Sequence, residues 1–374
     1  MPASRADDPH PRAVSTRTPA WRRWPAPGVV VLTAAVAVGA VMRAQENYAN
    51  VQLHAFTDSR SVTVLSPTVD LSVDFTDRMA LRTRFGVDAV SAASDSCVRC
   101  HPQGEHTQRS YINSSVTRAY GDTKVSVGGE FSKENFYQAT TGLGSISRTL
   151  NQGNTTIAGG YSFSWNQPVL HPYEDTARQF TNDGYASVTQ TVSKNTVVQV
   201  GYELSHVTGY QDSPFLRALV NGNRQSGNSP DVRTRQTLIA RLRQALPGET
   251  YLEADYRRYF DSWELRSNTL SLGLSHYITP RLLGNFTYRR YGQTGAFFYA
   301  PQYFGTPEYV TGDFRLGPFD ANLYTGRLVI TPTDGFWVFP AASGLTLQYE
   351  FYKTTTGFES AMFTTGVRVP LPHR

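Results

Sequence analysis

The chain has 374 residues, with 35 basic and 30 acidic side chains and a formal net charge of +5 at pH 7. The surplus of positive charge comes from arginines in residues 1–44, and the rest of the chain is close to neutral. This balance excludes the strongly basic surface that nucleic-acid-binding proteins use.

Residues 1–44 are predicted to be a signal peptide with a long N-terminal region. Several arginines between residues 12 and 23 precede an apolar run at 29–41, which is too short to span a bilayer but fits the core of a signal peptide. Cleavage is expected after Ala44, with Ala40 as the alternative site. An uncleaved signal anchor is the other interpretation. Residues 45–374 are therefore expected to be exported through the inner membrane and to form the folded part.

Most of residues 45–374 alternate apolar and polar side chains, as a strand with two different faces must. In residues 68–75 the odd positions are apolar and the even ones polar. The next run has Leu81 and Phe85 on one face and Arg82 and Arg84 on the other. Similar runs recur to about 358–369 and give about sixteen strands. The fold class predicted is all-β, a transmembrane antiparallel β-barrel of the outer-membrane type.

The connections between these runs favour a membrane barrel over a secreted β-sandwich. Short turns near residues 76–78, 121–122, 152–153, 193–195, 247–248 and 279–281 alternate with longer stretches, notably 208–231 and 293–322. Tight periplasmic turns and long outer loops are typical of outer-membrane barrels. Aromatic groups around Trp263 and around Phe298 are expected to form girdles at two rims. The bacterial outer membrane is the predicted location, and its lipid a predicted partner.

Both cysteines of the chain lie in the pentapeptide CVRCH at residues 97–101. Two thiols two residues apart, followed at once by histidine, form the attachment pattern of a covalent c-type haem held by Cys97 and Cys100, with His101 as the proximal iron ligand. A disulfide between the two cysteines is the first alternative, and zinc bound by both cysteines, His101 and His106 is the second. The motif falls in a predicted loop at residues 91–108, which the strand count places on the outer side.

A haem at this loop needs a distal iron ligand or leaves that position open. His171 and His206 are expected near the same rim and are the better distal candidates. His106 is close in sequence, but it would have to pass around the porphyrin edge. Each of these histidines is also compatible with a solvated residue at the rim.

Three stretches carry a family resemblance. Residues 256–263 read YRRYFDSW, residues 288–299 read YRRYGQTGAFFY, and residues 85–94 read FGVDAVSAAS. They resemble the bacterial family catalogued as domain of unknown function 3570. The resemblance implies an outer-membrane β-barrel of unassigned function and supplies no catalytic residues. The inserted CVRCH pentapeptide departs from that family's usual pattern.

The sequence is compatible with two functions of different classes. The motif favours electron transfer at or across the outer membrane. Because one haem cannot bridge a hydrocarbon core of about 30 Å, periplasmic or surface cytochromes would be partners. The alternative is a porin or structural barrel whose cysteines form a disulfide, with inward charges that line a lumen or pair for stability. The sequence has no phosphate-binding loop, nucleophile elbow or metalloprotease helix, so we do not expect an enzyme.

Overall fold

A computed structural model describes residues 47–92, 105–135, 137–168, 177–213, 216–332, 334 and 338–372. The expected signal peptide and the CVRCH pentapeptide lie outside these ranges. Within them, no helix has the length and apolar character needed to cross a membrane.

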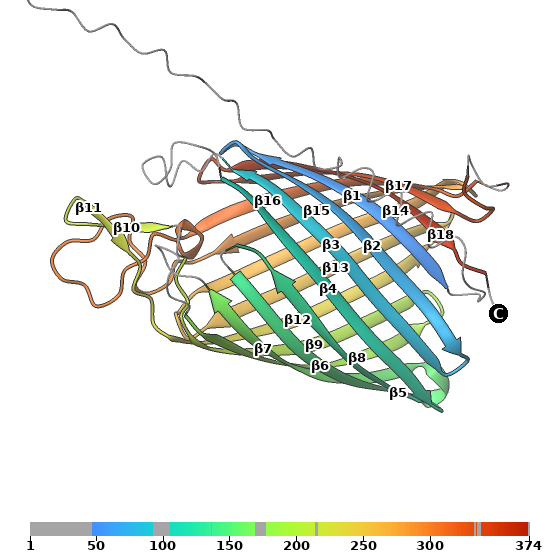
Figure 1. The fold of residues 1–374 in the computed structure, drawn as a ribbon. Helices are drawn as coiled ribbons and strands as arrows, with labels where there is room; N and C mark the ends of the chain where they lie inside the picture. Colours follow the sequence, from blue (N-terminus) through green and yellow to red (C-terminus); the bar gives the residue numbers. More distant parts are fainter. Residues whose placement is uncertain are drawn as a thin grey trace, which may run out of the picture.

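Sixteen antiparallel strands close into one barrel, which confirms the predicted fold class (Figure 1). β1 pairs with β18 to close the sheet, with Val51 opposite Val367. β9 pairs with β12, because β10 and β11 form a separate hairpin. Closure leaves no open strand edge, as a lipid-facing sheet requires. The barrel strands are β1 Tyr48–Asp58, β2 Val62–Thr76, β3 Met79–Ala92, β4 Glu105–Tyr120, β5 Thr123–Lys133, β6 Tyr137–Leu150, β7 Thr155–Pro168, β8 Gln179–Ser193, β9 Thr196–Gly209, β12 Val232–Leu246, β13 Thr250–Asp261, β14 Arg266–Thr279, β15 Leu282–Gln293, β16 Phe319–Ile330, β17 Gly344–Thr354 and β18 Glu359–Pro370; the hairpin is β10 Arg217–Val220 and β11 Asn223–Ser226.

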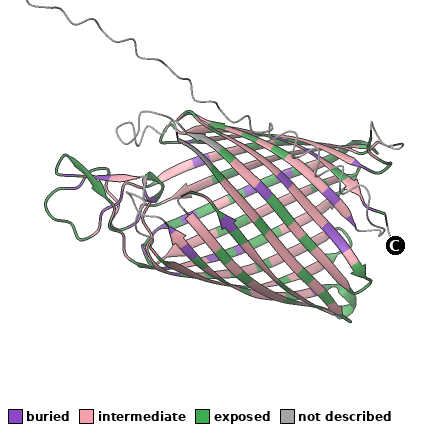
Figure 2. Cartoon of the chain, in the orientation of Figure 1, coloured by how far each residue is buried: buried purple, intermediate pink, exposed green. Residues whose placement is uncertain are grey.

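The outer wall of the barrel is apolar and the inner wall is polar. On β14, Leu270, Leu272 and Leu274 are 44%, 44% and 48% exposed, whereas Ser267 and Ser271 on the other face are buried. Figure 2 shows the same alternation of exposed and less exposed residues along the strands. So continuous an apolar outer surface is stable in contact with an apolar medium rather than water. The predicted orientation of the two strand faces is confirmed.

The two ends of the barrel differ in their connections. Tight turns join β2 to β3, β4 to β5, β8 to β9, β12 to β13 and β14 to β15, and the 3-10 helix η2 Asn151–Gly153 joins β6 to β7. These connections lie at the end where the first and last strands begin and finish, which we name the turn end (Figure 1). The connection at 331–343 is the longer one at this end. The connections at 210–231 and 294–318 lie at the opposite end, the loop end.

The connection at 210–231 leaves the barrel wall at a glycine and then folds back on itself. Gly209 has a φ of +93°, and a Cβ atom there would lie 2.2 Å from the carbonyl oxygen of Arg178, so a larger residue does not fit. Asn221 and Gly222, both with positive φ, form the tight turn between β10 and β11. Figure 1 shows this hairpin projecting beyond the loop end. The predicted long loop therefore contains regular structure.

Candidate functional site

The predicted haem site falls largely outside the described part of the chain. Cys97, Cys100, His101 and His171 belong to the segments that the structure does not describe. Covalent haem, the disulfide and the zinc site therefore stay predictions.

The strands on either side of the pentapeptide are described. Ala92 of β3 pairs with Glu105 of β4 at the loop end, and His106 follows in β4. His206 lies on β9, exposed on the outer face, with its Nδ1 3.0 Å from Thr234 Oγ1. Four strands, β5 to β8, separate β4 from β9 in the barrel wall. The structure therefore does not bring His206 next to the strands that flank the motif.

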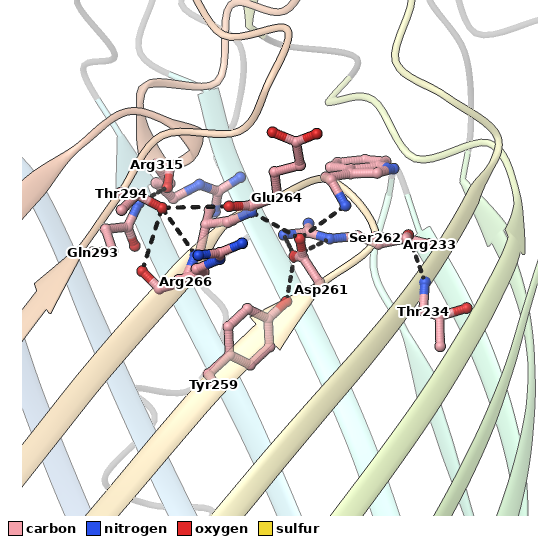
Figure 3. Close-up of polar contacts among 12 residues, drawn as sticks. Arg233, Thr234, Tyr259, Asp261, Ser262, Glu264, Arg266, Gln293, Thr294 and Arg315 are labelled. Carbon is pink, nitrogen blue, oxygen red and sulfur yellow. Dashed lines mark hydrogen bonds and ion pairs between the residues drawn. The ribbon is translucent and has the colours of Figure 1, made fainter.

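At the loop end, the YRRYFDSW stretch finishes in a buried ion pair (Figure 3). Arg233 Nη2 on β12 lies 2.5 Å from Asp261 Oδ2 at the end of β13, and the Asp261 side chain is fully buried. Tyr259 Oη donates a hydrogen bond of 2.6 Å to the same oxygen. The second carboxylate oxygen accepts hydrogen bonds from the backbone N–H groups of Trp263 and Leu265. Asp261 thereby fixes both the turn at 262–265 and the direction of the Arg233 side chain.

The aromatic residues expected at two rims belong to one cluster at the loop end. Trp263 is 2% exposed and meets Phe298 edge-on, with ring centroids 5.1 Å apart. Leu265 and Leu316 are buried in the same cluster. The expectation that Trp263 and Phe298 lie at two different rims is wrong, because the connections at 262–265 and 294–318 pack against each other. Their apolar surface anchors the second connection to the barrel mouth.

The connections at 210–231 and 294–318 also dock on each other, and we name the pair the loop cap. Val220 at the end of β10 forms a parallel bridge with Tyr303. Asn221 Nδ2 donates to the Gly305 carbonyl at 2.8 Å, and the Gly305 N–H donates back to Asn221 Oδ1 at 2.9 Å. Val220, Tyr303 and Val310 form a small buried apolar cluster beneath these bonds. The loop cap is therefore a folded unit beside the mouth.

Charged side chains on the inner face divide the lumen into two walls. On β12 to β16, arginines outnumber carboxylates, and on β2 to β9 carboxylates outnumber basic residues. Strand alternation and register give the arginine wall Arg233, Arg235, Arg241, Arg243, Arg257, Arg289 and Arg327 with Glu253, Asp255 and Asp261, and give the carboxylate wall Asp70, Asp74, Asp88, Glu130, Asp183 and Glu203 with Arg82, Arg84, Arg109 and Lys124. The strand order places these two walls on different sides of the barrel.

A recess of about 720 Å³ opens in the arginine wall near the loop end. It is lined by inner-face residues of β12 to β16 and by the 3-10 helix η3 Phe314–Leu316, which the loop cap brings to the mouth. Arg289 Nε donates to Ser271 Oγ at 3.0 Å, and within the described ranges no ion pair joins Arg289 to a carboxylate. Arg315 pairs with Asp313 at 2.8 Å, and this hydrogen bond raises the pKa of Arg315. The recess therefore offers guanidinium groups that the protein does not fully neutralise.

A second recess of about 620 Å³ lies beside it, between the two walls. Arg235 lines this recess, and its Nε is buried without a hydrogen-bond partner. Its neighbour Arg257 is paired with Glu203, with 3.0 Å between Nη2 and Oε2. A buried donor without a partner is costly, and such a donor is satisfied when a ligand or water accepts its proton. Arg235 and Arg289 are the inner-face groups best placed to meet an anion.

Arg235 and Arg289 were not among the site residues predicted from the sequence, where the inward charges form a single class. The signal was present on β12, where arginines recur at every second position at 233–235 and again at 241–243. The net charge of the polar face therefore differs from one group of strands to the next, and this difference marks the division of the lumen.

Comparison with known proteins finds solved structures of low sequence identity and one family model. No curated protein sequence matches the chain. OpdK of Pseudomonas aeruginosa, solved with vanillate, is 7% identical, with 86% of this chain and 98% of that chain covered and a TM-score of 0.45. A mutant ferric enterobactin receptor, PfeA, of the same organism is 12% identical over 84% of this chain and 54% of its own, with a TM-score of 0.42. A bacterial polysaccharide outer membrane secretin is 9% identical over 88% of this chain and 100% of its own, with a TM-score of 0.49.

The family comparison covers the strands that carry the arginine wall. The matched range includes both YRRY stretches, whereas residues 85–94, the third stretch of the resemblance, lie outside it. Over residues 170–332 the chain matches the model of a family described as a protein of unknown function, DUF3570.

Proposed function

We propose that this protein spans the bacterial outer membrane as a channel for small anionic solutes. The arginine wall carries the proposal, because Arg235 and Arg289 line lumenal recesses without a carboxylate partner among the described residues. Guanidinium groups bind carboxylate and phosphate with short, charge-assisted hydrogen bonds. The carboxylate wall on the other side adds a field across the lumen, which orients solutes that carry both charge and a dipole.

The membrane location rests on the outer wall of the barrel. Leucines, phenylalanines and tyrosines are exposed along its strands, and the sixteen strands of the closed barrel have no open edge. A barrel with this surface is stable in a hydrocarbon layer. The predicted signal peptide supplies the export through the inner membrane that such a location needs.

Ion selectivity in a planar bilayer tests the channel. We expect the purified protein to conduct and to prefer chloride over potassium in a salt gradient, as the reversal potential reports. The double variant Arg235→Gln/Arg289→Gln should lower the ratio of anion to cation permeability several-fold. Lys353→Gln is the matched control, because Lys353 lies on the outer face beside Glu359. A barrel that does not conduct refutes the channel, and an unchanged ratio in the double variant refutes the role of the two arginines.

A second candidate function is electron transfer through a covalent haem at Cys97, Cys100 and His101. The observation that favours it is the complete CVRCH pattern between β3 and β4, whose described ends meet at the loop end. The residue types are those that attach a c-type haem and supply its proximal ligand. Haem staining of the protein after denaturing electrophoresis tests this candidate: wild type expressed with its maturation machinery should stain, and Cys97→Ala should not. An unstained wild type refutes it and leaves the disulfide and the zinc site.

A further inference from the structure

Three arginines from neighbouring strands meet on the outer face of the barrel at the loop end. Arg258 on β13, Arg266 on β14 and Arg290 on β15 line one shallow hollow of about 580 Å³. Strand register places them together, because Arg258 pairs with Asn268 and Arg290 pairs with Leu270 on the two sides of β14. We name this hollow the outer arginine groove.

The two YRRY stretches build the groove in the same way. Tyr256 Oη and Arg258 Nη1 both donate to Asn268 Oδ1, at 2.7 Å and 3.0 Å. On the next hairpin, Tyr288 Oη and Arg290 Nη1 both donate to Asn322 Oδ1, at 2.7 Å and 3.3 Å. In each stretch the first arginine faces the lumen and the second faces outward. An asparagine amide orients the outward guanidinium without neutralising it.

The charge of the groove is only partly balanced. Asp320 is the carboxylate that lines the groove, and it pairs with Arg290 at 2.9 Å. Gly292 makes room for this pair, because a Cβ atom there would lie 2.5 Å from Asp320 Oδ1. Within the described ranges no ion pair involves Arg258 or Arg266. The groove therefore presents two arginine charges that have no acidic partner among the described residues.

The groove lies at the edge of the apolar band. The exposed leucines of β14 begin at Leu270, which is four residues from Arg266. At a rise of about 3.3 Å per residue and the usual strand tilt, this separation is about 10 Å along the barrel axis. Tyr256 pairs with Leu270 and Tyr288 with Leu272, so each tyrosine lies at the end of the leucine row, two residues from the outward arginine of its own stretch. Interfacial aromatic residues are found at this depth. Lipid headgroups occupy this depth.

We propose that the outer arginine groove binds the phosphate groups of a phosphorylated glycolipid in the outer leaflet. Arginine matches phosphate in geometry and charge, and three guanidinium groups on adjacent strands can contact more than one phosphate oxygen. The acyl chains of the same lipid would lie on the exposed leucines below. This inference rests on the proposed membrane location but not on conduction through the lumen.

Binding of lipid A by the purified full chain tests the inference. Native mass spectrometry of the protein in non-ionic detergent, titrated with bisphosphorylated lipid A, gives an apparent Kd. The double variant Arg258→Gln/Arg266→Gln should raise that Kd about tenfold or more, in keeping with the loss of two charge-assisted contacts. Lipid A from which both phosphates have been removed should bind wild type as weakly as the intact lipid binds the variant.

The control variant is Arg118→Gln/Arg148→Gln, which removes two arginines from the outer face near the turn end and should leave the Kd unchanged. Equal binding of phosphorylated and dephosphorylated lipid, an unchanged Kd in the groove variant, or an equal loss in the control overturns the proposal. Displacement of the lipid by inorganic phosphate at equal concentration also overturns it, because the site would then be one for free phosphate. Flotation of each variant with outer-membrane vesicles separates loss of lipid binding from failure of the membrane location.

Discussion

Replacement of Asp261 by asparagine should destabilise the barrel mouth by several kcal/mol. The carboxylate accepts hydrogen bonds from Arg233, from Tyr259 and from the backbone N–H groups of Trp263 and Leu265. Asparagine offers one acceptor oxygen, so either the two side-chain donors, Arg233 and Tyr259, or the two backbone N–H donors lose their acceptor. Arg233, whose side chain is 10% exposed, also keeps an uncompensated charge. Breaking a buried ion pair from one side costs about 3–5 kcal/mol, and the residual exposure of the Arg233 side chain favours the lower value, about 3 kcal/mol.

Unfolding in guanidinium chloride, followed by tryptophan fluorescence in detergent micelles, measures this loss of free energy. The matched control is Asp320→Asn, because the Arg290–Asp320 side chains are 46% and 48% exposed and such a pair contributes less than about 1 kcal/mol. The double variant Arg233→Met/Asp261→Asn should be less destabilised than Asp261→Asn alone, since the uncompensated charge is gone. If Asp261→Asn and Asp320→Asn lose the same free energy, the mouth does not depend on the buried pair.

Three further predictions concern the wall and the loop cap. Gly209→Ala should reduce the fraction of folded barrel on unheated gels, because alanine at this position has both an unfavourable φ and a steric clash. The control Gly144→Ala should leave that fraction unchanged, since the nearest atom to its new Cβ is 3.9 Å away. Equal fractions of folded barrel in the two variants would contradict the assigned backbone. Asn221→Ala should speed protease cleavage within 210–231 and leave ion selectivity unchanged, and resistance equal to wild type would show that the loop cap does not depend on this contact. Leu272→Arg should lower stability in the membrane by about 2–4 kcal/mol, while Ser145→Arg should be tolerated, because Ser145 lines the second recess on the inner face of β6; the reverse order would invert the faces.

The barrel was predictable because a two-residue period fixes both the strand and its buried face. In residues 68–75 the apolar and polar positions alternate without a break, and β2 follows that pattern with Asp70 inward. The turn residues predicted where short and long connections alternate. The number of alternating runs predicted an even number of strands. These signals are local, so each strand can be predicted from its own residues without knowing which strands lie next to it.

The mouth was not predictable from local patterns. Trp263 and Phe298 look like interfacial aromatic residues in sequence, and only the docking of 294–318 onto the barrel shows that they pack on each other. The pairing of Arg233 with Asp261 joins residues far apart in sequence on β12 and β13, and its burial depends on that same docking. Contacts between loops leave no periodic signal, because loops have no fixed repeat.

Arg257 and Arg258 are neighbours in sequence, yet one faces the lumen and the other the lipid. Side chains at neighbouring positions of this stretch are therefore exposed alternately to the lumen and to the lipid. In a variant whose Cys97 and Cys100 are replaced by serine, a cysteine at 257 should react with hydrophilic thiol reagents that enter the lumen. A cysteine at 258 should react with reagents that partition into the headgroup layer. A shift of the β13 pairing register by one residue would exchange these reactivities over the whole strand. Paired labelling at such positions can thus measure strand register in the living cell, without any purification of the protein.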